Sequence, residues 1–314
     1  MHSTRPSVLS TTRRIATLAA VMILAGSAPA WGPGDFPPGG PPTSQPARPP
    51  SDIPPRPIAP GQPGQPGQPG QPGEGGLPPR EAQFVANIER AHGAEAFGRK
   101  QALRADLDIN LGGEPYMVGT IIYEMTTGRS RIDLDSGETL VFDGEQAWVA
   151  PADSQFDMAR FHLRTWPYFL TAPFKIDDPG TRLEMVGLQT LNLRMCESAH
   201  LSFEPGVGDS PEDWYYVCAD PRTSQLAGLV YIVTYHQSVE KANQDTRAIV
   251  YSGYTSVDGV KLSTVWSFYR WDVNRGTYGP PEGRGRISNI QFIVPEDGAF
   301  EKPPGARQDS RPGR

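Results

Sequence analysis

The chain has 314 residues with two cysteines, and 29 basic against 35 acidic residues give it a net charge of −6. An acidic chain without a basic cluster argues against nucleic acid or an anionic membrane surface as its general partner. After the first thirty residues no run is long and apolar enough to span a bilayer, so an integral membrane protein is not expected.

The first thirty residues follow the pattern of a secretory signal. Arg5, Arg13 and Arg14 precede the uncharged apolar stretch 15–25, and Ala-Pro-Ala ends at Ala30. A membrane anchor is the alternative, but the stretch spans only about 16 Å as a helix, and a bilayer core needs roughly 20 apolar residues. We predict cleavage after Ala30 and a periplasmic or extracellular protein. The loss of three arginines and no acid then changes the net charge to −9; twin-arginine and general export both remain open.

Residues 31–80 differ in composition from the rest of the chain. They hold more than half of the 34 prolines, and Gly-Gln-Pro repeats run through 61–73. Such a segment buries too little apolar surface to offset its ordering entropy, so a disordered linker is predicted. The polar residues 301–314 are predicted to be a disordered tail, which leaves 81–300 as one folded domain.

A helix is predicted to open this domain. Pro78 and Pro79 precede it, Phe84, Val85 and Ile88 recur at helical spacing, and Gly93 can end it. Strand patterns separated by Asp-Gly, Ser-Gly and Thr-Gly turns dominate the rest. The strands are predicted over 102–111, 116–125, 129–135, 138–143, 146–150, 182–188, 193–203, 213–219, 226–236, 246–256, 260–272 and 286–294.

One further helix is predicted over 154–170, with Phe156, Leu163 and Trp166 along one side. Successive strands joined by tight turns indicate an antiparallel meander and not a parallel α/β sheet. The fold class is therefore mainly β (α+β). A strongly curved antiparallel sheet or incomplete barrel, with an N-terminal helix and a lid helix, explains the strands that are apolar on both faces; a closed barrel explains them equally.

The cysteines fall on either side of a turn-rich stretch, 204–212. A hairpin centred on Val207 places Cys196 opposite Cys218, close enough for a disulfide. Because an oxidising compartment favours pairing, we predict a Cys196–Cys218 disulfide that staples this hairpin.

Several stretches resemble a known family. Residues 119–132 (GTIIYEMTTGRSRI) and 139–151 (TLVFDGEQAWVAP), together with 254–262 (YTSVDGVKL) running into 266–269 (WSFY), are similar to LolA-like domains, the group of the periplasmic carrier of outer-membrane lipoproteins. Residues 166–180, 213–220 and 226–235 resemble an uncharacterised branch of that group. The resemblance covers about 85–295.

The resemblance implies a bent, incomplete barrel around an apolar cavity, with helices as a lid. It makes Arg131, with Arg129 as a rival, the candidate for the basic residue that holds the lid. Candidate cavity residues are the aromatic side chains Tyr123, Trp148, Phe161, Trp166, Tyr168, Phe169, Phe174, Tyr231, Tyr235, Tyr251, Trp266 and Phe268.

Motifs for catalysis are not found. The histidines are scattered without metal-ligand spacing, and no nucleophile elbow, phosphate loop or dinucleotide fingerprint is present. No cofactor or metal is expected. The leading hypothesis is a monomeric, non-enzymatic binder of a lipid, acyl chain or other apolar ligand. An interaction module for envelope protein or polymer, and an enzyme with an unrecognised site, are the alternatives.

Overall fold

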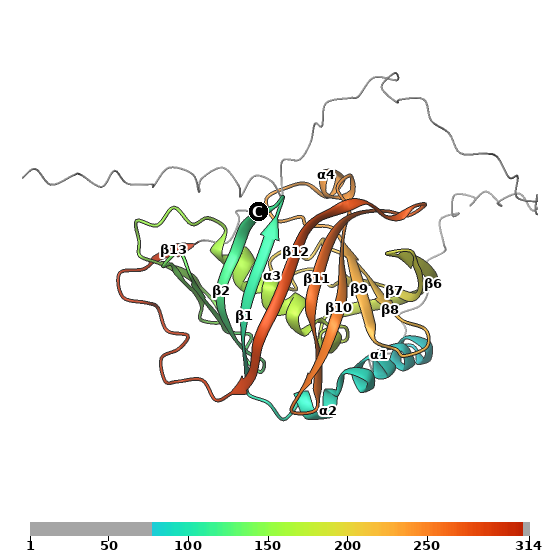
Figure 1. Cartoon of the computed structure of the whole chain (residues 1–314), viewed down its shortest axis with the longest axis horizontal. Coiled ribbons are helices and arrows are strands. Elements are labelled where there is room, and N and C mark those ends of the chain that lie inside the picture. Colours follow the sequence, from blue (N-terminus) through green and yellow to red (C-terminus); the bar gives the residue numbers. More distant parts are fainter. Residues whose placement is uncertain (1–76, 310–314) are drawn as a thin grey trace, which may run out of the picture.

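A computed structural model describes residues 77–309. The predicted signal peptide and nearly all of the predicted linker lie outside these residues and stay predictions. In the described part, one antiparallel sheet of thirteen strands carries the fold (Figure 1). The strands are β1 (Ala102–Leu111), β2 (Glu114–Glu124), β3 (Ser130–Leu134), β4 (Thr139–Phe142), β5 (Ala147–Ala150), β6 (Thr181–Leu191), β7 (Arg194–Phe203), β8 (Tyr215–Ala219), β9 (Leu226–Tyr231), β10 (Arg247–Val257), β11 (Val260–Asp272), β12 (Gly276–Ile293) and β13 (Arg307–Asp309).

The sheet is open, which decides between the two predicted architectures. Its strand order is β13-β5-β4-β3-β2-β1-β12-β11-β10-β9-β8-β7-β6, so β13 and β6 form separate edges. The helices are α1 (Pro79–His92), α2 (Ala94–Phe97), α3 (Ala159–Thr171) and α4 (Val239–Asn243), with a 3-10 turn, η1 (Ala172–Phe174), directly after α3. The prediction of a curved antiparallel sheet with helices is confirmed, and the closed barrel is wrong.

Strand β12 begins at Gly276, ten residues earlier than predicted, because its glycine-rich first half carries no apolar strand pattern. Gly283 and Gly285 lie opposite Phe268 and Trp266 of β11. A Cβ on Gly285 would lie 2.7 Å from Ile109 Cδ1 and 3.3 Å from Trp266 Cβ. The glycines therefore leave room for large side chains on the same face of the sheet.

The C-terminal segment is also more ordered than predicted. Residues 301–309, expected to belong to a disordered tail, end in β13, which pairs with β5 in the register Arg307↔Val149 to Asp309↔Ala147. The Arg307 guanidinium also donates to the carbonyl oxygens of Ser154 and Phe156. The disordered tail is thus wrong for 301–309, because its backbone completes an edge of the sheet.

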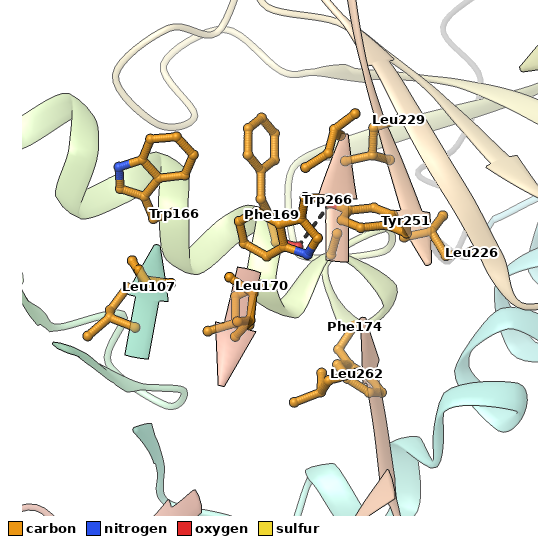
Figure 2. Close-up of a cluster of buried hydrophobic side chains, with 14 of the residues drawn as sticks. Leu107, Trp166, Phe169, Leu170, Phe174, Leu226, Leu229, Tyr251, Leu262 and Trp266 are labelled. Carbon is orange, nitrogen blue, oxygen red and sulfur yellow. Dashed lines mark hydrogen bonds between the residues drawn. The ribbon is translucent and has the colours of Figure 1, made fainter. Parts of the chain in front are cut away.

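Helix α3 lies in the concave face of the sheet (Figure 1). Its side chains Leu163 and Trp166 are 0% exposed, and the Trp166 ring stacks on Trp266 of β11 with centroids 6.5 Å apart. Figure 2 shows this cluster, with Phe169 and Leu170 reaching from the helix toward the strands. Burial of a leucine of this kind stabilises the fold by roughly 1.5–3 kcal/mol, so packing on the sheet holds α3 in place.

A proline within α3 frees a carbonyl group that the sheet then binds. Pro167 has no N–H to donate to the Leu163 carbonyl, one helical turn earlier. The Ser130 hydroxyl of β3 donates to this oxygen instead, at 2.7 Å and buried. Near the end of the helix, the Tyr251 hydroxyl donates to the Phe169 carbonyl at 2.9 Å. Side chains of the sheet therefore fix the helix at two points.

We expect Ser130→Ala to lower the free energy of unfolding by about 1–3 kcal/mol, because it leaves the Leu163 carbonyl buried without its donor. In a Pro167→Ala background the new N–H of residue 167 can serve that oxygen, so the same serine replacement should cost less. Urea unfolding of the wild type, both single variants and the double variant measures the coupling. Equal losses in the two backgrounds would contradict this account.

Helix α1 is tied to the sheet by His92, which is 0% exposed. Its Nε2 accepts the backbone N–H of Leu226 at 3.0 Å, and its Nδ1 donates to the Lys261 carbonyl at 2.8 Å. This pairing requires the neutral ring with its proton on Nδ1, and burial lowers the pKa of His92 to about 4. The next residue, Gly93, ends the helix with φ 80°.

The cysteines lie in a second, smaller apolar cluster, and they are free. The β7–β8 hairpin is shifted by two residues from the predicted register, so Cys218 lies opposite Ser198. The Ser198 hydroxyl is 3.5 Å from Cys218 Sγ. Burial raises the pKa of Cys196 to about 11 and that of Cys218 to about 12, so both thiols are protonated. The structure thus contradicts the predicted disulfide, because the 204–214 connection is not symmetric about Val207.

Candidate functional site

Most of the predicted cavity residues form the solid core between α3 and the sheet. Phe169 packs on Tyr231 with ring centroids 5.2 Å apart, and Trp166 meets Phe268 edge-on at 6.3 Å. This set fills the concave face under the helix and is at most 8% exposed: Trp166, Phe169, Phe174, Tyr231, Tyr251, Trp266 and Phe268.

Trp148 lies away from α3 in a contact between β5 and the C-terminal segment. Its indole N–H donates to Asp143 Oδ2 at 2.9 Å, and the Lys302 ammonium lies 4.5 Å from the ring centroid. Trp148 therefore does not line a hollow beside α3.

The other predicted residues, Tyr123, Phe161, Tyr168 and Tyr235, line two hollows beside α3. The first, of about 230 Å³, lies between the helix and the 203–215 segment; the second, of about 210 Å³, lies between the helix and the β2–β3 end of the sheet. Both are lined by Arg164, Tyr168, Lys175 and Asp178. We call the two hollows together the α3 groove.

Helical spacing produces the helix side of the groove. Phe161, Arg164, Thr165 and Tyr168 recur at intervals of three and four along α3 and so share one face. Across from them, Tyr215 packs against Tyr168 with ring centroids 5.3 Å apart, and Phe203 packs edge-on against Tyr215 at 6.0 Å. The first hollow therefore has a group of aromatic side chains in its wall, beside polar and charged ones.

The charged groups of the groove were not found from the sequence. Lys175 Nζ pairs with Asp178 at 3.1 Å. Arg164 is exposed and its guanidinium lies 5.1 Å from the Phe142 ring centroid, but no acidic side chain of the described residues pairs with it. The available signal was Arg164 one turn away from Tyr168, on the same face of the helix.

An acid also lies in the first hollow. Asp213 accepts both the N–H and the hydroxyl of Thr234 at 2.7 Å. Burial raises the pKa of Asp213 to about 6, and the Thr234 hydrogen bonds act against that rise. Burial therefore moves the titration of this acid toward neutral pH. Arg164 is the groove cation that has no acid partner among the described residues.

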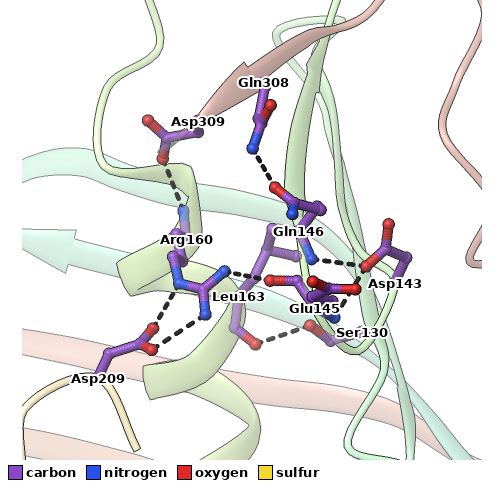
Figure 3. A network of polar contacts seen from close by, with 9 residues as sticks. All are labelled: Ser130, Asp143, Glu145, Gln146, Arg160, Leu163, Asp209, Gln308 and Asp309. Atoms are coloured by element: carbon purple, nitrogen blue, oxygen red, sulfur yellow. Dashed lines mark hydrogen bonds and ion pairs between the residues drawn. The ribbon is translucent and has the colours of Figure 1, made fainter. Parts of the chain in front are cut away.

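The 203–215 side of the groove is held to α3 by Arg160 (Figure 3). Its guanidinium makes two bonds to Asp209, at 2.6 and 3.0 Å, and one to the Glu145 carbonyl at 2.7 Å. The side chains of Arg160 and Asp209 are only 7% and 8% exposed. The backbone N–H of Arg160 donates to Asp309 Oδ2 at 2.8 Å, so β13 supplies a cap for the first turn of the helix.

Arg131 was the wrong candidate for the residue that holds the helix. It bonds Asp133 at 2.7 and 2.8 Å and the Ala299 carbonyl at 3.4 Å. Arg129, the rival, pairs with Glu124 at 2.7 Å. The family resemblance pointed to strand residues, whereas Arg160 binds the 203–215 segment from the helix itself.

The described residues show neither a metal centre nor a membrane-spanning helix. No group of three or more histidine, cysteine, aspartate or glutamate side chains among residues 77–309 is arranged to hold a metal ion. Over the same residues, no helix has the length and apolar character needed to cross a membrane.

The fold defines the class of the protein: an open antiparallel half-barrel whose concave face holds a helix. No protein-family model matches the sequence, and no curated protein does. Among solved structures, the chain is similar to a LolA superfamily protein from Nitrosomonas europaea at 8% identity and TM-score 0.46, covering 71% of this chain and 97% of that one.

Two other solved structures give comparable alignments. A DUF1329 family protein from Desulfovibrio piger is 14% identical with TM-score 0.44, over 70% of this chain and 97% of that one. A putative outer membrane lipoprotein-sorting protein domain from Vibrio parahaemolyticus is 8% identical with TM-score 0.41, over 69% and 97%.

Proposed function

We propose that this protein is an exported, non-enzymatic binder of a single-chain amphiphile, which it holds in the α3 groove. The observation that carries the proposal is the groove itself, which joins a partly aromatic hollow to Arg164, a cation without an acid partner among the described residues. Export is proposed from the charged start, short apolar stretch and Ala-Pro-Ala site of residues 1–30.

The apolar part of the ligand would lie against Phe161, Phe203 and Tyr215. Ligand sites usually measure about 300–1,000 Å³, and each of the two hollows, of about 230 and 210 Å³, is smaller than that. This size favours one acyl chain over a lipid with several. The filled core under α3 removes the larger cavity that the sequence predicted.

The polar part of the ligand would lie at Arg164, which lines both hollows. A guanidinium binds a carboxylate or phosphate through two parallel hydrogen bonds. The second hollow also holds Lys175, which pairs with Asp178. These three side chains leave one positive charge in the second hollow, which an anionic head group would balance.

Native mass spectrometry of the protein purified from its own cell envelope tests both parts of the proposal. The expected spectrum shows a chain that lacks residues 1–30 and carries a bound amphiphile of one acyl chain. A chain of full mass would overturn export, and a chain without any adduct would count against a retained ligand.

Binding of a fluorescent fatty acid supplies the quantitative test. Arg164→Met should weaken binding about tenfold, because a hydrogen-bonded charge contributes roughly 1.5–3 kcal/mol, and it should not weaken binding of a fatty alcohol of the same length. Arg90→Met is the matched control, since Arg90 is an exposed arginine of α1 that does not line the groove. Equal affinities of the wild type and Arg164→Met for the fatty acid would overturn the assignment of the head group.

A further inference from the structure

The large apolar side chains that are exposed to solvent are concentrated at one place. Within residues 77–309 there are seven of them, and five belong to the β6–β7 hairpin or the β11–β12 turn. Single exposed apolar residues are ordinary, but a cluster marks an interaction surface. The five are Val186 (38% exposed), Leu188 (60%), Leu193 (91%), Met195 (51%) and Val273 (62%).

The two hairpin tips lie side by side (Figure 1). The backbone N–H of Asn192 donates to the Thr277 hydroxyl at 3.1 Å, and the Trp271 indole donates to the Thr190 carbonyl at 3.2 Å. At Gly276, with φ 71°, a Cβ would lie 2.7 Å from the Thr190 oxygen. The tips therefore form one surface, from which Leu193 and Val273 project.

Leu193 occupies a conformation that leucine rarely adopts. Asn192 and Leu193 have φ values of 45° and 62°, in the left-handed region that favours glycine and asparagine. The Leu193 side chain is 91% exposed, so burial within this chain does not offset the strain. The two-residue turn between Leu191 and Arg194 requires this backbone conformation, and it presents the Leu193 side chain at the tip of the hairpin.

Two arginines accompany the apolar residues at the tips. Arg194 follows Leu193, and Arg275 lies two residues after Val273; both are exposed. Neither forms an ion pair with an acid of the described residues, and Arg275 lies 5.4 Å from the Tyr278 ring centroid. In the same turn, Asp272 accepts the Asn274 backbone N–H. Guanidinium groups beside exposed apolar chains match the phosphates and acyl boundary of a phospholipid layer.

We propose that the β6–β7 and β11–β12 tips dock on the surface of a phospholipid bilayer. Leu193 and Val273 enter the boundary between head groups and acyl chains, and Arg194 and Arg275 bind lipid phosphates. The net charge of −9 after the predicted cleavage disfavours long-range attraction to an anionic membrane. Docking therefore depends first on the apolar side chains of the tips, and the protein should bind zwitterionic as well as anionic lipid. This inference is independent of the α3 groove.

Sedimentation of the mature chain, which begins at Trp31 after the predicted cleavage, with phosphatidylcholine vesicles, with and without phosphatidylglycerol, tests the proposal. The wild type should sediment with both. Leu193→Asn keeps a residue suited to the left-handed turn, and it should lower the partition coefficient about tenfold, in line with the transfer of one leucine side chain. Arg194→Gln and Arg275→Gln should each lower it by up to about fivefold.

Val294→Asn is the matched control, since Val294 is 76% exposed but lies outside both tips; its partition should equal that of the wild type. Thermal unfolding of Leu193→Asn should show an intact fold. The proposal is overturned if the wild type stays in the supernatant with both kinds of vesicle, or if Leu193→Asn and the wild type sediment alike. Leu193-dependent self-association without vesicle binding would also overturn it, in favour of a second copy of the chain as the partner.

Discussion

Replacing Arg160 by methionine is expected to lower the free energy of unfolding by about 3–5 kcal/mol, the usual cost of breaking a buried ion pair by removing one partner. The variant leaves Asp209, 8% exposed, without this guanidinium and leaves the Glu145 carbonyl without its donor. The segment that closes the first hollow would also lose its bonds to α3. Urea unfolding followed by tryptophan fluorescence measures the effect.

Arg164→Met, one turn later on the same helix, is the control for this result. Arg164 stacks on the same Phe142 ring as Arg160, with distances to the ring centroid of 5.1 and 5.0 Å, but it is exposed and has no carboxylate partner among the described residues. Its loss should cost no more than about 1 kcal/mol. Arg160→Met/Asp209→Asn should be less unstable than Arg160→Met, because the buried charge is gone. If Arg160→Met and Arg164→Met are equally stable, the buried ion pair does not hold the segment.

The second large effect is a loss of stability in mild acid caused by two buried histidines. Burial lowers the pKa of His92 to about 4 and that of His162 to about 3, from 6.5 in an unfolded chain. Above pH 6.5 both rings are neutral in the folded and in the unfolded chain, so the contribution of the buried rings to the free energy of unfolding is fully present. As the pH falls below 6.5 the unfolded chain binds protons first, and each histidine should cost about 3 kcal/mol by about pH 4.

His162→Phe separates the loss of stability caused by histidine protonation from the effect of titrating carboxyl groups. Asp213 acts in the opposite direction, because its raised pKa of about 6 lets the folded state bind a proton before the unfolded one. Phenylalanine suits the aromatic surroundings of His162, where Tyr116, Phe161 and Trp166 lie with ring centroids 5.3–6.0 Å away. The free energy of unfolding should therefore fall less between neutral pH and about pH 4 in the variant than in the wild type. Identical pH profiles would show that His162 titrates normally in the folded state.

The strands and their turns could be predicted from the sequence because their signals are local. Residues 102–111 and 260–272 alternate strongly, and Gly93, Gly128 and Gly259 mark turns at positive φ. Strand β12 was predicted too short because its glycines carry no apolar pattern. Their role depends on Trp266 and Ile109, side chains far away in the sequence that pack over them.

The groove could be predicted only in part, because it depends on contacts between residues that are far apart in the sequence. An apolar pattern cannot distinguish Trp166, which packs into the core, from Phe161 and Tyr168, which line a hollow on another face of the same helix. The identity of Arg160 as the residue that binds the 203–215 segment depends on Asp209, 49 residues away. The predicted pairing of the cysteines was wrong because the β7–β8 hairpin is centred on Gly208 and not on Val207, which shifts the register by two residues.

The cap that Asp309 places on α3 couples two regions 149 residues apart in the sequence. A nascent chain that has not yet reached residue 309 lacks the acceptor for the first turn of α3, however complete its sheet. This capping bond therefore forms late in the maturation of the domain. Chain elongation and, for an exported polypeptide, release on the far side of the membrane must precede it.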